Sequence, residues 1–127
     1  MPYTLLIVDD SKLARMAATK ALKILRPDWT RVEATNADEA VSLAKDTAFD
    51  VALLDFNMPG RDGLQLAADL LAIRPSTPLA IVSANNQAEI VARATDIGAV
   101  FLMKPLNEQS LGAFLENAVQ RLEQGRA

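Results

Sequence analysis

The sequence of 127 residues contains no cysteine and no histidine. The lack of cysteine excludes disulfides, thiolate zinc sites and cysteine nucleophiles. The lack of histidine excludes imidazole bases, phosphohistidine and histidine-ligated metals. Any chemistry of this chain must therefore use carboxylates, hydroxyl groups and lysine amines.

The sequence also lacks an excess of positive charge and a long hydrophobic run. Lysine and arginine number 13 against 16 acidic residues, and the pI is near 4.9, whereas sequence-independent binding of nucleic acid needs clustered positive charge. The apolar run at residues 5–8 stops at Asp9, far short of a signal-peptide core or a membrane span. We therefore expect no direct nucleic-acid partner, no membrane insertion and a cytoplasmic location.

What the chain does contain is typical of a folded globular domain. Half of its residues are hydrophobic, 23% are charged and the mean hydropathy is +0.12, which argues against both disorder and a bilayer location. The length matches one average domain. We expect residues 1–127 to form a single domain.

Short apolar segments predict five strands, near residues 4–8, 31–35, 51–54, 79–82 and 99–103. Four are nearly continuous in apolar residues, as parallel strands covered on both faces should be, whereas residues 31–35 alternate and predict an edge strand. Segments with helical spacing separate them, the first with an apolar stripe at Leu13, Met16, Ala17, Ala21, Ile24 and Leu25. This alternation predicts a doubly wound α/β fold, a five-stranded parallel sheet of flavodoxin-like (βα)5 type with strand order 2-1-3-4-5.

Polar residues follow four of these strands: Asp9 and Asp10, then Asp55, Ser83 and Lys104. The carboxyl ends of parallel strands share one edge of the sheet, so these side chains should converge. Paired carboxylates repel by roughly 2 to 4 kcal/mol at about 4 to 8 Å and an effective dielectric constant of about 20, which predicts a bound cation. Oxygen ligands that leave room for water and a phosphate favour Mg²⁺ over Ca²⁺, with Lys104 as a second positive charge.

These residues carry a resemblance to a known family. The acid pair, the run at residues 54–63 (Leu-Asp-Phe-Asn-Met-Pro-Gly-Arg-Asp-Gly), Ser83-Ala84 and Lys104-Pro105 together resemble the receiver domain of two-component response regulators, the CheY-like type that stands alone as a single domain. The resemblance covers essentially the whole chain, and its four elements appear in order at strand ends.

The resemblance implies a site built on Asp55 as phosphoacceptor, supplied by the phosphohistidine of a sensor histidine kinase or phosphotransfer protein, or by a small acyl phosphate. It implies Mg²⁺ held by Asp10, Asp55 and the backbone carbonyl of Asn57, with Asp9 acting mostly through a metal-bound water. It implies that Lys104, the Ser83 hydroxyl and the Ala84 backbone N–H hold the phosphoryl oxygens. Such a domain is a regulator that promotes only its own phosphorylation and dephosphorylation, not an enzyme with another substrate.

The resemblance also implies a switch and an output surface. Ser83 would move toward the phosphoryl group, and Phe101 would turn into the space behind it. A downstream protein would then bind the fourth helix, fifth strand and fifth helix, at Ile90, Arg93, Phe101, Met103 and Leu106. A dimer that depends on phosphorylation is left open, and the peptide bond between Lys104 and Pro105 is expected to be cis.

Three other functions compete with this interpretation. A flavin-binding site would place phosphate near the loop that holds Asp9 and Asp10, where repulsion disfavours it. A phosphatase of the haloacid dehalogenase type has a second aspartate two residues after its nucleophile, where this chain has Asn57. The main alternative is an interaction module that keeps these residues and signals without phosphorylation.

Overall fold

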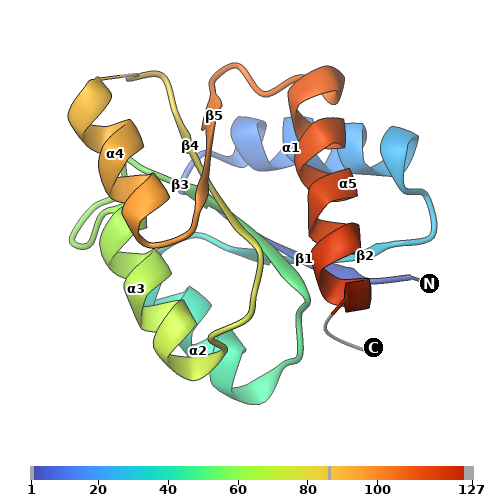
Figure 1. Cartoon of the computed structure of the whole chain (residues 1–127), viewed down its shortest axis with the longest axis horizontal. Coiled ribbons are helices and arrows are strands. Elements are labelled where there is room, and N and C mark those ends of the chain that lie inside the picture. Colours follow the sequence, from blue (N-terminus) through green and yellow to red (C-terminus); the bar gives the residue numbers. More distant parts are fainter. Residues whose placement is uncertain (1, 86, 125–127) are drawn as a thin grey trace.

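The computed structural model describes residues 2–85 and 87–124, and within them strands and helices alternate (Figure 1). The elements are β1 (Thr4–Val8), α1 (Lys12–Leu25), β2 (Thr30–Ala34), α2 (Ala37–Asp46), β3 (Val51–Asp55), α3 (Gly63–Ile73), β4 (Leu79–Ser83), α4 (Ala88–Asp96), β5 (Val100–Met103) and α5 (Glu108–Gln124). All strand pairs are parallel, and the order across the sheet is β2-β1-β3-β4-β5. The predicted fold class and strand order are confirmed.

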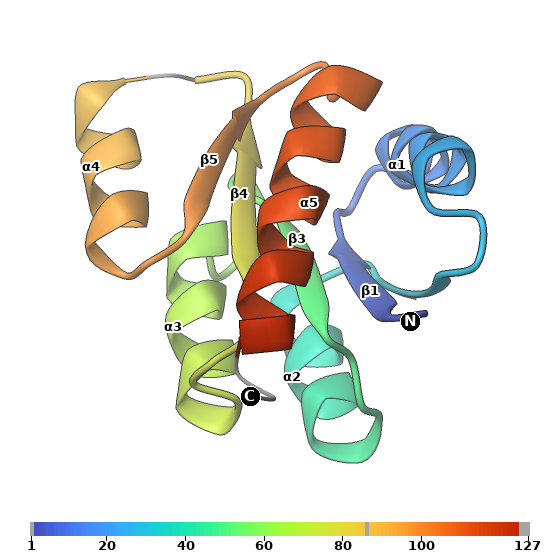
Figure 2. The ribbon, with the colours of Figure 1, turned by 45° about the vertical axis from the view of Figure 1, so that its right-hand side comes forward.

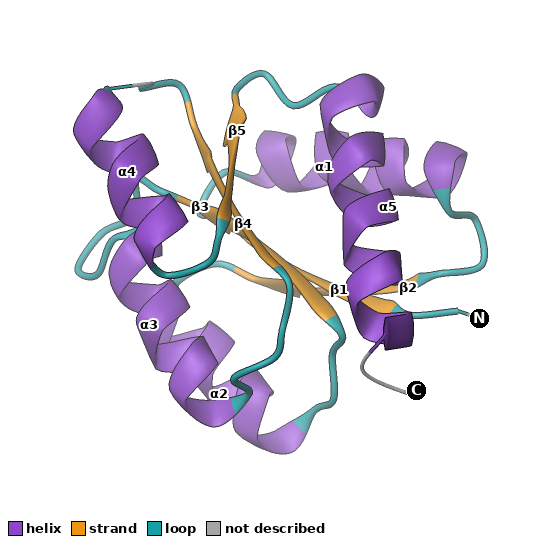
Figure 3. Cartoon of the chain, in the orientation of Figure 1, coloured by secondary structure: helices purple, strands orange, loops and turns teal. Residues whose placement is uncertain are grey.

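Helices cover both faces of the sheet. Figure 2 shows α1 and α5 on one face and α2, α3 and α4 on the other, and Figure 3 shows the sheet as the middle layer. Successive strand residues alternate between the two layers: Leu6 and Val8 belong to the core cluster under α2 and α3, whereas Leu5 and Ile7 belong to the cluster under α1 and α5. Burial on both faces explains why the central strands are continuous apolar runs in the sequence.

The edge strand β2 differs from the central strands in having one apolar face and one charged face. Ala34 is fully buried and Val32 packs against the same core cluster, while Arg31 and Glu33 alternate with them and form an ion pair, with 3.2 Å between Arg31 Nε and Glu33 Oε2. One face of this strand is thus apolar and the other carries charges. The predicted edge strand is confirmed. The apolar segment near 99–103, expected to be covered on both faces, instead forms β5 at the other edge of the sheet, where Val100 and Met103 are exposed.

The apolar stripe predicted for the first helix is only partly correct: Ala21 is buried and Leu25 packs against the core, but other members of the stripe are exposed. The residues of α1 that are buried are Ala18, Ala21 and Leu22, whereas the side chains of Leu13, Met16 and Ile24 are 78%, 56% and 55% exposed. The small alanines face inward because they allow the helix to lie close to the sheet, and Met16 and Ile24 border a surface groove beside β2 instead. Apolar residues on two sides of α1 made the helical spacing ambiguous.

The end of the sheet opposite the carboxyl ends of the strands holds the single tryptophan. Trp29 is buried just before β2, with its ring edge-on to Tyr3 at a centroid separation of 5.3 Å. The N–H of Thr30 donates to the carbonyl of Tyr3 at 3.0 Å, which starts the β1–β2 pairing there. None of the helices in the described part of the chain is long and apolar enough to cross a membrane.

Candidate functional site

The polar residues that follow the strands meet at the carboxyl edge of the sheet. Asp55 ends β3, Asp9 follows β1 directly, and Lys104 follows β5. These three residues line a cavity of about 360 Å³, and the rest of its lining is apolar and comes from β1, α1, β3, β4, Ala84 and the segment after Lys104. Residues up to 95 positions apart in the sequence are thus neighbours, since Lys104 Nζ donates a hydrogen bond to Asp9 Oδ2.

Three carboxylates share this position. Asp9, Asp10 and Asp55 each offer an oxygen within 4.8 Å of the other two. Asp9 and Asp55 are buried, at 7% and 5% exposure, while Asp10 is exposed. Lys104 lies among them, with Nζ 3.0 Å from Asp55 Oδ1 and 3.3 Å from Asp9 Oδ2. The predicted convergence of the acids with a lysine is present in the structure.

Burial dominates the electrostatics of Asp55. Loss of solvent raises the pKa of its carboxyl above the usual value, and the nearby charge of Asp9 adds to the rise. The hydrogen bond and positive charge of Lys104 and the backbone N–H of Asn57 lower the pKa again, without cancelling the effect of burial. The anionic form of Asp55 therefore gains from any additional positive charge at this site.

The pKa of Lys104 is also raised, but here the raised pKa favours the charged form. Its partial burial lowers the pKa of the ammonium group, but the hydrogen bond to Asp55 and the charges of Asp55 and Asp9 outweigh burial, so the pKa lies above the ordinary 10.5. Lys104 is therefore a fixed positive charge at any physiological pH. It is a single charge, however, and it faces three carboxylates.

The donor set fits Mg²⁺. Carboxylate oxygens are the ligands that this hard cation prefers, and a sparse set leaves coordination positions for water and substrate oxygens. One ammonium group against three carboxylates leaves the cluster with an excess of negative charge. A divalent ion would remove it.

The loop between β3 and α3 is held close to Asp55. A Cβ on Gly63 would lie 2.5 Å from the carbonyl oxygen of Asp55, so this close approach requires glycine. Gly60 has a φ of +84°, which also favours glycine. Asp62 caps α3 in a reciprocal capping box with Gln65. The two glycines and the helix cap therefore hold this loop beside Asp55.

Arg61 attaches the same loop to two helices. Its guanidinium group forms ion pairs with Asp38 of α2 and Asp69 of α3. The hydrogen bond to Asp38 is the main reason that the pKa of Arg61 is raised, and that to Asp69 is the next. Sequence analysis did not single out this residue, because its partners lie 23 positions before it and 8 positions after it.

The remaining candidates lie around the cluster and not within it. Ser83 is 1% exposed, and its Oγ accepts a hydrogen bond from the N–H of Asn85 at 3.0 Å. Its carbonyl accepts from the N–H of Lys104 at 3.0 Å, which joins the ends of β4 and β5. Asn57 is exposed, and Phe101 is half-buried at a β5 position paired with Ile81. Among the described residues that line the cavity, Ser83 and Phe101 are not included.

Backbone geometry agrees with one further expectation. The peptide bond between Lys104 and Pro105 is cis. Pro105 and Leu106 continue the lining of the cavity beyond Lys104.

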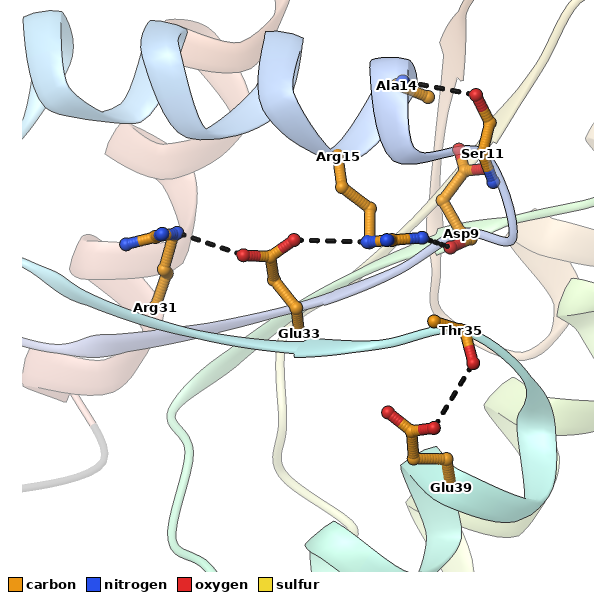
Figure 4. Close-up of polar contacts among 8 residues, drawn as sticks. All are labelled: Asp9, Ser11, Ala14, Arg15, Arg31, Glu33, Thr35 and Glu39. Atoms are coloured by element: carbon orange, nitrogen blue, oxygen red, sulfur yellow. Dashed lines mark hydrogen bonds and ion pairs between the residues drawn. The ribbon is translucent and has the colours of Figure 1, made fainter.

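Sequence analysis also missed Arg15 of α1. Its Nη1 donates to the carbonyl oxygen of Asp9 at 2.7 Å (Figure 4). The only available signal was an arginine six residues after Asp9, at a helix position that the predicted apolar stripe left on the outside. A backbone carbonyl as its partner leaves no trace in the sequence.

The described geometry has counterparts among known proteins. The family model described as the response regulator receiver domain matches residues 5–116. The transcriptional regulatory protein PdtaR of Mycobacterium tuberculosis is 33% identical over 127 residues, which cover 98% of this chain and 60% of PdtaR. The nitrate/nitrite response regulator protein NarL of Escherichia coli is 34% identical over 119 residues, which cover 92% of this chain and 55% of NarL. The chain thus spans less than two thirds of the length of these curated relatives.

Solved structures show the same fold. A receiver domain protein (CheY-like) from Methanospirillum hungatei JF-1 superposes with a TM-score of 0.87 at 22% identity, covering 98% of this chain and 99% of that one. The chemotaxis protein CheY4 of Vibrio cholerae gives a TM-score of 0.83 at 25% identity, with coverages of 93% and 99%. The similarity in sequence and the similarity in fold thus both extend over most of the chain.

Proposed function

Because this chain belongs to the response regulator receiver domains of two-component systems, we propose that it accepts a phosphoryl group on Asp55. The donor would be the phosphohistidine of a sensor histidine kinase or phosphotransfer protein, or a small acyl phosphate. The observation that carries the proposal is the buried carboxylate of Asp55, 3.0 Å from the Lys104 ammonium group and within the acid cluster. We also propose that residues 1–127 act as one receiver domain and turn over no other substrate.

The reaction requires little covalent chemistry from the protein. A carboxylate oxygen of Asp55 attacks phosphorus in line with the leaving group, a P–O bond to Asp55 forms, and the P–N bond of phosphohistidine or the P–O bond of the acyl phosphate breaks. The leaving group keeps the electron pair of the broken bond. Lys104 holds an oxygen of the transferred group and offsets its charge, so no histidine base is needed.

Bound Mg²⁺ would neutralise negative charge on the phosphoryl oxygens. Asp10, Asp55 and the backbone carbonyl of Asn57 would supply its protein ligands, with Asp9 acting mostly through a water molecule. This assignment is consistent with the shared position of the three carboxylates and with the backbone contact between Asn57 and Asp55.

The switch would start at the β4–α4 loop. A phosphoryl group carries nearly two negative charges, and the Ser83 hydroxyl and Ala84 N–H would bind its oxygens. Ser83 would then exchange its contact with the Asn85 N–H for the phosphoryl group. Phe101, half-buried on the neighbouring strand, would turn into the space that Ser83 leaves, and the change would reach the surface of α4, β5 and α5.

A downstream protein, or a second copy of the domain after phosphorylation, would bind this surface. Met103 is 43% exposed and Arg93 is exposed, so both are accessible to a partner. Ile90, which sequence analysis placed on the same surface, is only 6% exposed and contributes to the core instead. We therefore leave Ile90 out of the proposed output surface.

Incubating the full chain with acetyl phosphate and Mg²⁺ should add about 80 Da, the mass of HPO₃, to a single side chain. Intact mass spectrometry measures this addition, and omission of Mg²⁺ provides the control. Continuous release of phosphate would support the phosphatase alternative instead. If the chain shows neither a phosphoryl adduct nor release of phosphate, the result would support the interaction module and contradict the proposed function.

Mg²⁺ should also stabilise the fold. Binding to the folded state alone adds about 2.7 kcal/mol at one hundred times Kd, which corresponds to a rise of several degrees in melting temperature. The increase should be larger near pH 7 than at acidic pH, because Mg²⁺ binds the anion of Asp55, whereas the raised pKa of Asp55 favours its protonated form in the metal-free fold. The stabilisation of the metal-free fold by protonated Asp55 is complete below the ordinary aspartate pKa and is lost as pH rises through the raised value.

Calorimetry at low ionic strength, with Asp10→Asn as the comparison, measures this effect. The variant should lose most of the increase, since Asp10 is one of the three clustered acids. An unchanged melting temperature of the wild type in millimolar Mg²⁺, with no effect of Asp10→Asn, would show that the cluster binds no metal.

A further inference from the structure

We propose that Arg15 is a positioning residue for the Asp9–Asp10 pair, and that Glu33 of the edge strand β2 holds Arg15 in place. The metal affinity of the site would then depend on charged residues that bind neither metal nor phosphoryl group. The inference rests on the proposed function, because it assumes that the acid cluster binds Mg²⁺.

The hydrogen-bonding groups of Asp9 are all engaged. Its N–H donates to the carbonyl of Ala34 at 3.1 Å, which continues the pairing of β1 with β2 by one residue. Its Oδ1 accepts from the N–H of Ser11 at 2.9 Å, and its Oδ2 lies 3.3 Å from Lys104 Nζ. The carbonyl oxygen is the remaining group, and it accepts from Arg15 Nη1 at 2.7 Å. Asp9 is therefore fixed on every side.

Arg15 is itself held by β2. Its Nε donates to Glu33 Oε1 at 3.1 Å, and the other oxygen of Glu33 accepts from Arg31 Nε at 3.2 Å. Figure 4 shows the resulting row, in which Arg31, Glu33 and Arg15 lead along the edge of the sheet to Asp9. Only 14% of the Arg15 side chain is exposed, against 42% for Arg31. The buried end of the row is thus the end that reaches the site.

The geometry suits arginine and not lysine. A planar guanidinium group presents several N–H donors in fixed directions, so Arg15 can bond the Asp9 carbonyl and the Glu33 carboxylate at once. Glu33 pairs with Ile7 in the sheet register, and Ala34 pairs with Val8. Both backbone groups of Asp9 are therefore attached to β2, the N–H directly through Ala34 and the carbonyl through Arg15 and Glu33.

This attachment fixes the peptide unit that joins Asp9 to Asp10. The Asp9 carbonyl belongs to that unit, so a rotation of the unit would break the 2.7 Å bond to Arg15. The same rotation would move the Asp10 backbone and carry its carboxylate away from Asp55. Residues that orient metal ligands in this way typically change metal affinity by about 10- to 100-fold when they are replaced.

Mg²⁺ titration of the full, metal-free chain by isothermal calorimetry tests the inference. Arg15→Met should weaken Mg²⁺ binding by about tenfold, at the lower end of that range because a single peptide unit is released. Arg31→Met is the matched control, since Arg31 contacts Glu33 but not Asp9, and its affinity should stay within about twofold of wild type. Arg15→Lys should give an intermediate affinity, because one amine cannot serve both partners.

Amide hydrogen exchange without metal gives a second measurement. The Ser11 N–H, which donates to Asp9 Oδ1, should exchange faster in Arg15→Met and in Glu33→Gln than in Arg31→Met. Urea unfolding shows whether each variant folds, and Glu33→Gln, which keeps the arginine, carries the test if Arg15→Met does not fold. Unchanged Mg²⁺ affinity in a folded Arg15→Met, or equal losses in Arg31→Met, would overturn the inference.

The outcomes also separate the inference from the proposed function. Phosphoryl uptake by the wild type together with unchanged Mg²⁺ affinity of Arg15→Met would overturn the inference alone. Weaker Mg²⁺ binding in Arg15→Met without phosphoryl uptake by the wild type would support the positioning role and overturn phosphoryl acceptance. A wild type that binds no Mg²⁺ and gains no mass would overturn both.

Discussion

Replacing Asp55 by asparagine is expected to abolish phosphoryl uptake, which is the largest effect of any single substitution considered. The amide has almost the shape of the carboxylate but no anionic oxygen to attack phosphorus. After incubation with acetyl phosphate and Mg²⁺, the intact mass of Asp55→Asn should equal that of the untreated variant. A phosphoryl adduct as abundant as in the wild type would show that another side chain is the acceptor.

The matched control for this substitution is Asp62→Asn. Asp62 lies in the same loop but caps α3, and asparagine is an equally good helix cap, so this variant should still gain the phosphoryl group. Asp55→Asn itself should remain folded, because it removes a charge whose burial is unfavourable and leaves Lys104 its contact with Asp9. Loss of uptake would therefore report chemistry and not unfolding.

Lys104→Met should slow phosphorylation by about 10²- to 10³-fold, the usual cost of removing one donor that stabilises developing negative charge. The ammonium group is 3.0 Å from the oxygen of Asp55 to which we assign the attack, so a transferred group would lie beside it. The rate should be measured from the appearance of the phosphorylated mass at saturating Mg²⁺. Lys45→Met of α2, away from the cavity lining, serves as the control and should react as the wild type does.

The same variant should change the pH dependence of the rate. Lys104 lowers the pKa of Asp55 by its hydrogen bond and its charge, so its loss leaves burial and Asp9 to raise that pKa further. The reactive form of Asp55 is the anion, and the rate should therefore begin to rise at a higher pH in Lys104→Met than in the wild type. If Lys104→Met is phosphorylated at the wild-type rate and with the wild-type pH dependence, Lys104 takes no part in the mechanism.

The fold could be predicted from the sequence because β1, β3 and β4 are buried on both faces of the sheet and therefore consist of nearly continuous apolar residues. The alternating pattern of β2 likewise identified its edge position. The inward face of α1 could not be predicted, because alanines that permit close approach look no more buried in the sequence than the exposed Met16 and Ile24. Side-chain size, not hydrophobicity, decided which face of this helix packs inward.

The acid cluster was predictable for a different reason: strand ends converge by topology alone, whatever the packing. Asp9, Asp55 and Lys104 needed only the strand order to become neighbours. Arg15 and Arg61 could not be found in this way, since Arg15 binds a backbone carbonyl and Arg61 joins two helices through partners on either side of it. The roles assigned to Ser83, Asn57, Ala84 and Phe101 remain predictions.

The distance of Trp29 from the acids has a practical consequence for spectroscopy. Trp29 packs on Tyr3, and six residue-to-residue steps of about 3.3 Å each lead from Tyr3 along β1 to Asp9, so roughly 20 Å lie between the indole and the carboxylates. The fluorescence of Trp29 will therefore change on denaturation but not when an ion or phosphate binds at the acid cluster. A dye coupled through a cysteine introduced near Ala84 would report those ligands without a competing thiol, because the natural chain has none.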